Sequence, residues 1–219
     1  MTEGRMRFTV RELEGAFPTN AKIRGPRPIQ GDVMQAIADG ALIIEAPTGT
    51  GKTALEFTVA ERARQKAAAG ESVFVIFPTK ALVEQACREH PDMVGVLGQN
   101  DHICPWALSE FTDDESKLVT DVDLPILYDT DTPRVSDIPH DMHRECPHYV
   151  DQETGRTAVA GVAACPYYQQ THEAKRSGRV IACTMSFYIF AKLFNEERYG
   201  KVAALIIDEA HRFADVIRY

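Results

Sequence analysis

A glycine-containing loop between an apolar run and a helical segment constrains the fold of this chain more than any other feature. The loop, residues 45–53, has the sequence EAPTGTGKT. It follows the apolar residues 41–44 and precedes residues 54–66, which favour a helix. Glycines in such a loop let successive N–H groups face one oxyanion, and the next helix directs its positive end at the same group. The sequence therefore predicts a strand–loop–helix unit that binds phosphate.

The residue types in this loop indicate a nucleoside triphosphate as the ligand. The side chain of Lys52 can reach the β- and γ-phosphates, and the hydroxyl of Thr53 can bind Mg²⁺. The alternative is an accidental match, which average residue usage makes roughly one in fifty for a chain of this length. We therefore predict that the loop binds nucleotide through Thr48, Gly49, Thr50, Gly51, Lys52 and Thr53.

Charge is unevenly distributed over the 219 residues, whose net charge is −8. Residues 105–151 hold 12 acidic and 3 basic residues, a local balance of −9, so the remaining residues carry a net charge of +1. The acidic total therefore does not exclude a nucleic-acid partner. The sequence has no run of 18 apolar residues and no apolar signal region at its start. We expect a cytoplasmic protein without a membrane span, in which five cysteines do not form disulfides.

Apolar runs alternate with helical segments on both sides of a long irregular stretch. This alternation predicts an α/β fold with a parallel sheet covered on both faces. The irregular stretch, residues 98–178, contains many Asp and Pro residues and three of the five cysteines. A structureless loop of that length is uncommon inside a compact domain, so we predict an inserted subdomain. The domain boundaries are then 1–97 for the first part of the main domain (with an N-terminal segment 1–25), 98–178 for the insertion, and 179–219 for the return to the main domain.

Local patterns also predict individual elements. A first strand ends at Glu45, and further strands are expected at 72–77, 93–97, 179–183 and 202–207. Beyond the helix after the loop, helices are expected at 10–16, 31–39, 80–90 and 186–195, and residues 24–30 read as a rigid, proline-rich entry.

An acidic pair follows the last apolar run. Asp208 and Glu209 begin the tetrad DEAH, which His211 completes. The carboxyl end of a parallel strand is where such sheets bind ligands. There Asp208 can hold Mg²⁺, and Glu209 can orient or deprotonate an attacking water. The alternative is a charged helix start, because acidic residues favour first turns.

Together these segments resemble superfamily 2 helicases. The phosphate loop is similar to motif I of that family, the DEAH tetrad to motif II, and residues 77–82 (FPTKAL) to motif Ia. The resemblance implies a RecA-like P-loop NTPase domain that uses ATP and Mg²⁺, with Lys52, Asp208, Glu209 and His211 in catalysis. It also implies that Thr79 and Lys80 contact the phosphates of a DNA strand, and that Gln30 pairs its amide with adenine.

The cysteine-bearing insertion resembles that of the DinG/XPD branch, where it holds a [4Fe–4S] cluster. Three cysteines of residues 98–178 resemble the ligands of that branch: Cys104, Cys146 and Cys165. Four thiolates are normally needed, so a fourth ligand is missing unless a histidine such as His143 or His148 substitutes. A zinc site is a further alternative, although the spacing is no recognised zinc pattern. A vestigial cluster domain, as the resemblance to CRISPR-associated DinG proteins implies, is the preferred interpretation.

The resemblance implies a larger machine. We expect this chain to be the N-terminal part of an ATP-dependent helicase that translocates 5′ to 3′ on single-stranded DNA, with an arch domain and a second RecA-like domain elsewhere. Alone it would turn ATP over very slowly or not at all. One alternative is a non-catalytic module that docks in a CRISPR defence or DNA-repair complex through its acidic insertion. Another is a small-molecule kinase, which the DEAH tetrad and residues 77–82 argue against.

Overall fold

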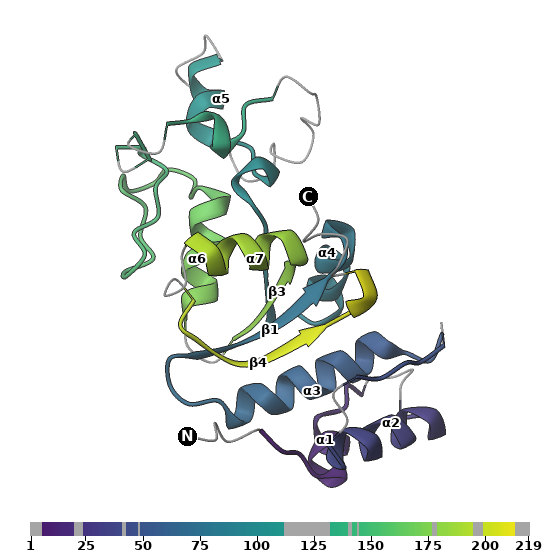
Figure 1. Cartoon of the computed structure of the whole chain (residues 1–219). Coiled ribbons are helices and arrows are strands. Elements are labelled where there is room, and N and C mark those ends of the chain that lie inside the picture. Colours follow the sequence, from purple (N-terminus) through teal and green to yellow (C-terminus); the bar gives the residue numbers. More distant parts are fainter. Residues whose placement is uncertain are drawn as a thin grey trace. The chain divides into compact units, whose positions relative to one another are not determined.

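The chain forms two compact units in a computed structural model. The structure describes residues 6–19, 24–40, 43–47, 49–111, 132–139, 142–143, 145–176, 179–194 and 199–212. Unit 1 consists of Met1–Met93 with Ser177–Tyr219, and unit 2 of Val94–Arg176 (Figure 1). No helix in the described part of the chain is long and apolar enough to cross a membrane.

A parallel sheet is the centre of unit 1. The described strands of unit 1 are β3, β1 and β4, side by side in this order, and β2 begins at the boundary with unit 2. β1 pairs in parallel with β3 on one side and with β4 on the other. The predicted α/β fold with a parallel sheet is therefore confirmed. The strands are β1 (Glu71–Phe77), β2 (Met93–Val96), β3 (Val180–Thr184) and β4 (Lys201–Ile207).

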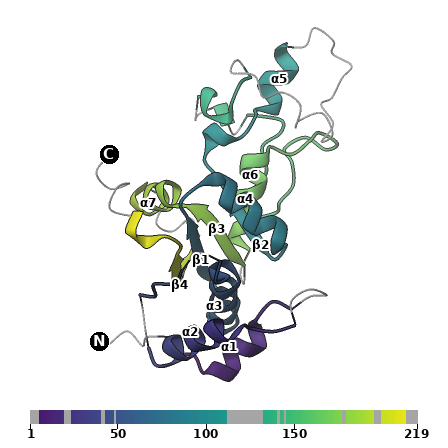
Figure 2. The same cartoon turned by 90° about the vertical axis from the view of Figure 1, so that its right-hand side faces the viewer.

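Burial along the strands follows their position in the sheet. The last five residues of β1 are all buried, because this strand has neighbours on both edges and helices on both faces. β4 is less covered, and Leu205 in it is 40% exposed. The helices α3 (Lys52–Lys66) and α7 (Met185–Phe194) lie on opposite faces of the sheet (Figures 1 and 2), and α4 (Lys80–Glu89) packs on β1 and β3.

The amino ends of β1 and β4 approach each other closely. Gly70 precedes β1 and Gly200 precedes β4, and both have positive φ angles. A Cβ atom added to Gly200 would overlap the backbone carbonyl oxygen of Gly70. Only glycine at position 200 therefore permits this close approach of the two strands.

Two short helices complete unit 1 beside α3. The first, α1 (Val10–Ala16), begins with a capping box in which Thr9 and Glu12 satisfy each other's backbone N–H groups. The second, α2 (Pro28–Ala38), begins three residues before Gly31, so the predicted start of this helix was wrong. The reason is that Pro28 occupies the first helical position, where its fixed φ favours the helix and its missing N–H costs nothing.

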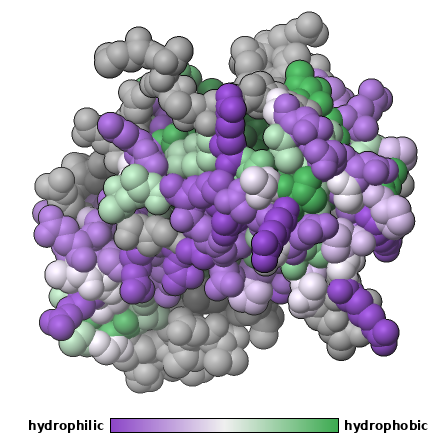
Figure 3. All heavy atoms as spheres, turned by 90° about the horizontal axis from the view of Figure 1, so that it is seen from below, coloured by the Kyte–Doolittle hydropathy of each residue, from purple (hydrophilic) through white to green (hydrophobic). Residues whose placement is uncertain are grey.

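Charged residues bind α1 to α3 at the surface. The carboxylate of Glu12 pairs with Arg62 and with Lys66, each at 2.9 Å. The pKa of Glu12 is well below its usual range because Arg62, and then Lys66, donate hydrogen bonds to it. The face in Figure 3 is mostly hydrophilic, with hydrophobic residues in separate small groups. Exposed ion pairs contribute little stability, so burial must hold these helices together.

A small apolar core lies beneath those charges. Its fully or nearly buried members are Leu13 of α1, Phe17 directly after α1, Met34 of α2 and Leu55 of α3. The three helices thus join through side chains that the helical periodicity places inward.

One predicted strand is not formed in the part of the chain that the structure describes. The apolar run before the phosphate loop was expected to be a strand ending at Glu45, but residues 43–46 pair with no described strand. Ile43 is 91% exposed. An extended segment becomes a strand only beside a partner, and a cavity lies between this segment and β4.

Unit 2 is built around a second apolar core. It contains η1 (Gln99–Asp101), α5 (Pro105–Phe111), η3 (Val135–Asp137) and α6 (Pro166–Lys175). The sequence predicted no sustained helix here, and α6 with ten residues corrects that expectation. Both α5 and α6 begin at a proline that directly follows a cysteine. Proline is favourable at the first position of a helix. The acidic residues 112–131 lie outside the described residues.

Shortening one buried side chain tests the core beneath α1, α2 and α3. We expect Met34→Ala to lower the free energy of unfolding by about 2–5 kcal/mol, because Met34 is fully buried and its removal leaves a cavity. Urea denaturation followed by circular dichroism measures the change. Ile29→Ala is the matched control on the same helix, since Ile29 is 41% exposed and its loss should cost within about 0.5 kcal/mol. Equal effects of the two substitutions would contradict this assignment of the core.

Candidate functional site

The phosphate loop has the backbone geometry that its sequence predicts. Gly49 and Gly51 have φ angles of 82° and 79°, in the left-handed region that favours glycine. The hydroxyl of Thr50 donates a hydrogen bond of 2.9 Å to the carbonyl of Pro47, which closes the loop. Thr48, the remaining predicted loop residue, lies outside the described residues.

The helix that follows the loop points its amino terminus at the same place. α3 is 15 residues long and begins at Lys52, with Gly51 as its N-cap. Lys52 and Thr53 are both exposed. The first N–H groups of a helix have no partner within it, and the helix dipole adds positive charge there. This end of α3, with the ammonium group of Lys52, is suited to an anion such as a polyphosphate.

The side chain of Gln30 contacts the backbone of the phosphate loop. Its side chain is 4% exposed. The amide nitrogen donates a hydrogen bond of 3.3 Å to the carbonyl of Gly51, and the amide oxygen accepts one of 2.8 Å from the backbone N–H of Arg27. The guanidinium of Arg27 donates to the carbonyl of Gly49 at 3.2 Å. These hydrogen bonds hold α2 against the loop. Pairing of Gln30 with adenine remains a prediction.

The DEAH tetrad follows β4 at the carboxyl edge of the sheet. The backbone N–H of Asp208 donates a hydrogen bond of 2.9 Å to the carbonyl of Ile76 in β1, so the ladder continues to this residue. Glu209 has a φ of 48°, which for a residue other than glycine marks a strained turn. Its carboxylate pairs with Arg212 at 3.3 Å. His211 is exposed in the short helix η5 (Ala210–Arg212).

Thr79 and Lys80 follow β1 at the same edge. The hydroxyl of Thr79 accepts a hydrogen bond of 3.4 Å from the backbone N–H of Leu82 and so caps α4. Both side chains are exposed. Since β1 and β4 are parallel, the residues after their carboxyl ends lie along one edge. Contact of these two residues with a nucleic acid stays a prediction.

A carboxyl group that the sequence analysis overlooked lies beside Asp208. Glu56 is on α3, four residues after Lys52 and therefore on the same face of the helix. Burial, and then the neighbouring charge and hydrogen bond of Asp208, raise the pKa of Glu56 to about 8. The i,i+4 spacing from Lys52 was a signal in the sequence, but Asp208 is 152 positions away and its approach depends on the fold.

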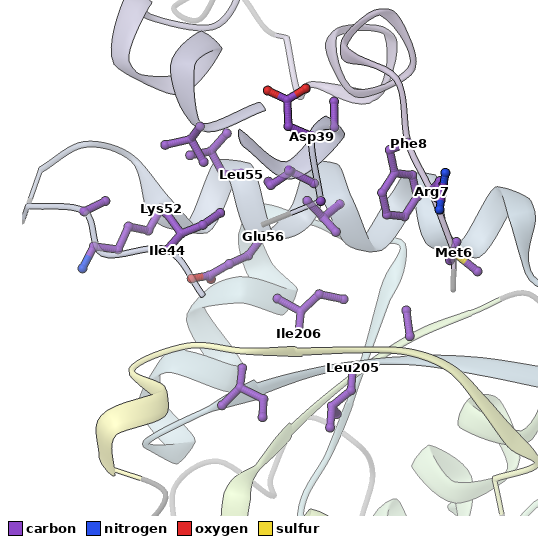
Figure 4. A pocket seen from close by; sticks show the side chains of 18 residues that line it. Met6, Arg7, Phe8, Asp39, Ile44, Lys52, Leu55, Glu56, Leu205 and Ile206 are labelled. Carbon is purple, nitrogen blue, oxygen red and sulfur yellow. The ribbon is translucent and has the colours of Figure 1, made fainter. Parts of the chain in front are cut away.

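Lys52 and Glu56 border a cavity of about 600 Å³ in unit 1. Lys52 and Glu56 line it from α3, Ile44 and Ala46 from the segment before the loop, and the residues Ala204, Leu205, Ile206 and Ile207 from β4. Figure 4 shows the side chains of Lys52 and Glu56 extending in the same direction, with Ile206 of β4 below them. The cavity thus runs along the free edge of β4, close to the phosphate loop.

The three insertion cysteines come together in unit 2. Cys104, Cys146 and Cys165 line one void with His143, and all three are buried. The void measures only about 10 Å³, the space of a single water molecule. Burial raises the pKa of the Cys165 thiol to about 11 and also raises that of Cys146. The backbone N–H of Ala107 donates a hydrogen bond of 3.5 Å to the sulfur of Cys104, and the small void leaves no room for a cluster beside the three sulfur atoms.

Both candidate histidine ligands contact backbone carbonyl groups. His143 contacts the carbonyl of Ile138 at 2.9 Å through Nε2 and the hydroxyl of Tyr168 at 2.7 Å through Nδ1. His148 contacts the carbonyl of Ala163 at 2.7 Å through Nδ1. Within the described residues, no group of three or more His, Cys, Asp or Glu side chains is arranged to hold a metal ion. The arrangement in the described part of unit 2 does not fit an iron–sulfur cluster.

The remaining cysteines and the aromatic residues of unit 2 are part of packed surroundings. Cys183 is fully buried in β3, and Cys87 on α4 is partly buried. Tyr167 and Tyr168 are buried in the core of unit 2 with Trp106 and Tyr149 packed against it. Packing, rather than stacking on nucleic-acid bases, accounts for these rings in the structure.

Part of the chain matches a known protein family. Residues 27–131 match the family described as DEAD/DEAH box helicase. The match contains the phosphate loop, Thr79 and Lys80, and it ends before Asp208. It supports a helicase superfamily and, with it, the use of ATP and Mg²⁺ in a nucleic-acid helicase activity. A search among curated protein sequences gave no match.

A pair of glycine substitutions tests the loop geometry. At both positions alanine would adopt a positive φ, which costs about 1–2 kcal/mol. An added Cβ at Gly51 would also approach the amide nitrogen of Gln30 to 2.5 Å, whereas at Gly49 it meets nothing within 4 Å. We expect Gly51→Ala to lower both the melting temperature and the affinity for a fluorescent ATP analogue more than Gly49→Ala does. Identical effects of the two variants would show that the contact with Gln30 is unimportant.

Purified protein tests the interpretation of the cysteines. We expect anaerobically purified protein to contain no iron and to lack the absorption band near about 400 nm that thiolate-ligated iron–sulfur clusters show. Iron analysis and a visible spectrum measure this. A brown protein with stoichiometric iron, lost on Cys165→Ala, would contradict the packed arrangement around the 10 Å³ void.

Proposed function

We propose that this chain is the N-terminal, nucleotide-binding part of an ATP-dependent DNA helicase that moves along single-stranded DNA. The observation that carries the proposal is the position of the phosphate loop at the amino end of α3, with Asp208 following β4 at the carboxyl edge of the sheet. A site for polyphosphate and a carboxylate for its metal ion are the two parts that phosphoryl transfer needs.

Each residue of the proposed site has a distinct role. The ammonium of Lys52 binds the β- and γ-phosphates, while the hydroxyl of Thr53 and the carboxylate of Asp208 hold Mg²⁺, directly or through water. Glu209 orients and deprotonates the water that attacks the γ-phosphate. His211 follows in the same turn and completes the catalytic set. Mg²⁺ neutralises charge that develops on the phosphate oxygens.

The proposed DNA contact is the start of α4. The N–H groups in the first turn of a helix and the ammonium of Lys80 attract a phosphate of the strand. Thr79 and Lys80 are exposed at the sheet edge that also carries Asp208. Movement at the nucleotide can therefore reach the DNA contact through β1 and β4.

The narrower assignment rests on sequence resemblance. We propose the DinG/XPD branch, and with it 5′ to 3′ translocation and duplex unwinding, on the basis of the cysteine-bearing insertion. Within that branch, the missing fourth cysteine favours a role in CRISPR defence. We further propose that a second RecA-like domain supplies the arginines of the complete ATP site, so that the 219 residues alone hydrolyse ATP very slowly.

A lysine substitution tests the nucleotide site. We expect Lys52→Ala to weaken binding of Mg–ATP by roughly 10- to 150-fold, since a hydrogen bond to a charged group contributes about 1.5–3 kcal/mol. A fluorescent ATP analogue measures the affinity of the chain. Lys80→Ala is the matched control, which should leave nucleotide affinity unchanged and weaken binding of a single-stranded oligonucleotide.

The same variants separate the motor from a docking module. In a protein that includes the second motor domain, Lys52→Ala should abolish unwinding. Function that survives this substitution would favour the alternative, a non-catalytic module that binds partners through its acidic residues. A robust DNA-stimulated ATPase rate of the 219-residue chain would contradict the proposed need for a second domain.

A further inference from the structure

The side chain of Gln30 holds the phosphate loop from the side of α2. It is only 4% exposed, although Gln side chains in folded proteins are mostly exposed. Its Nε2 donates a hydrogen bond of 3.3 Å to the carbonyl of Gly51, and its Oε1 accepts one of 2.8 Å from the backbone N–H of Arg27. One side chain therefore joins the start of α2 to the residue that caps α3. A buried amide that is bonded at both ends presents little of its edge to a nucleotide base.

The contact between Gln30 and the loop depends on the glycine at position 51. A Cβ atom added to Gly51 would lie 2.5 Å from Nε2 of Gln30, so a larger residue would push the amide away. The same carbonyl also accepts a hydrogen bond of 3.4 Å from the backbone N–H of Leu55, the first hydrogen bond of α3. Two donors thus fix the direction of this carbonyl, and one of them comes from α2.

The direction of the Gly51 carbonyl decides where the next N–H group points. A peptide bond is planar and trans, so the carbonyl of one residue and the N–H of the following residue point in opposite directions. Holding the Gly51 carbonyl toward Gln30 and Leu55 therefore turns the N–H of Lys52 outward from the amino end of α3. This is the end of the helix at which an anion is favoured.

Arg27 repeats this arrangement two residues earlier in the loop. Its guanidinium donates a hydrogen bond of 3.2 Å to the carbonyl of Gly49. Because the peptide bond is planar, the N–H of Thr50 points away from that hydrogen bond. N–H groups of neighbouring residues that face one point form a site for a phosphate oxyanion. The first turn of α2 thus orients the loop through its carbonyl groups, on the side opposite to the ligand.

We propose that Gln30 is a positioning residue of the phosphate site, which holds the Gly51 carbonyl so that the N–H of Lys52 faces the phosphates; this rests on the proposed function. Gln30 then contributes to the affinity for the phosphate chain, and it contributes equally whichever base the nucleotide carries. Pairing of Gln30 with adenine has a different consequence, because its loss would leave the affinity for a ligand without a base unchanged. Inorganic tripolyphosphate has the phosphates and no base, so it distinguishes the two roles.

The experiment measures, by titration calorimetry, the affinity of the 219-residue chain for Mg–ATP and for Mg–tripolyphosphate. Gln30→Met keeps a side chain of similar length and removes both hydrogen bonds. We expect it to weaken the binding of both ligands by the same factor, about 2- to 12-fold, the effect of losing one hydrogen bond. Gln35→Met is the matched control on the same helix, since Gln35 is exposed and its amide donates to Asp39. The control should leave both affinities within about twofold of the wild type.

The affinity of Gln30→Met for tripolyphosphate decides the proposal. An unchanged value overturns it, whether binding of ATP weakens, as adenine pairing predicts, or only the melting temperature falls, as a purely structural role predicts. If Gln30→Met does not fold, as circular dichroism would show, Gln30→Leu gives the same comparison with a smaller side chain. A wild-type chain that binds neither ligand overturns the proposed function and this role with it. Wild-type binding of both ligands with an insensitive variant removes only the role of Gln30.

Discussion

Parallel pairing of β1 with β4 is the interaction on which the rest of unit 1 depends. The pairing runs from Glu71 opposite Lys201 to Ile76 opposite Ile207, and the N–H of Asp208 extends it by one more hydrogen bond. Since both strands point the same way, the turns that follow them reach one edge of the sheet. This places Thr79, Lys80 and Asp208 along that edge, although 128 positions separate Lys80 from Asp208 in the chain. β3 on the other side of β1 buries the centre of the sheet and fixes the pair.

Elements with strong local patterns were predictable from the sequence. The strands expected at 72–77 and 202–207 differ from β1 and β4 by one residue at the start, because continuous apolar runs bounded by glycine specify buried strands. Helix α1 has the predicted bounds, which its capping box defines. The run at 41–44 has an equally apolar sequence, but strand formation also needs a partner at the right place, which no local pattern reveals. The ten-residue helix α6 was missed because its buried tyrosines are spaced for a small core and give no long amphipathic stripe.

The site shows the same division between local and distant information. The positive φ angles of Gly49 and Gly51 follow from the residue types, and so does the helix that starts at Lys52. The effect of Asp208 on the pKa of Glu56 does not, because only the fold brings these two residues near each other. For the cysteines, sequence suggested the right neighbours, and the three do line one void. What it could not foresee is how tightly that void is packed and that His143 uses both ring nitrogens for Ile138 and Tyr168.

The close approach of Gly70 and Gly200 has a consequence for chemistry at the opposite end of the strands. A strand advances about 3.3 Å per residue and alternates its side chains between two faces. If β4 slipped by one position along β1, Asp208 would move by that distance and its carboxylate would turn to the other face of the sheet. The absence of a side chain at Gly200 lets the two strands begin side by side. Glycine at this position therefore sets where the pairing begins, and the one-residue register shift between Ser72 and Val73 sets which residue of β4 reaches the carboxyl edge of the sheet.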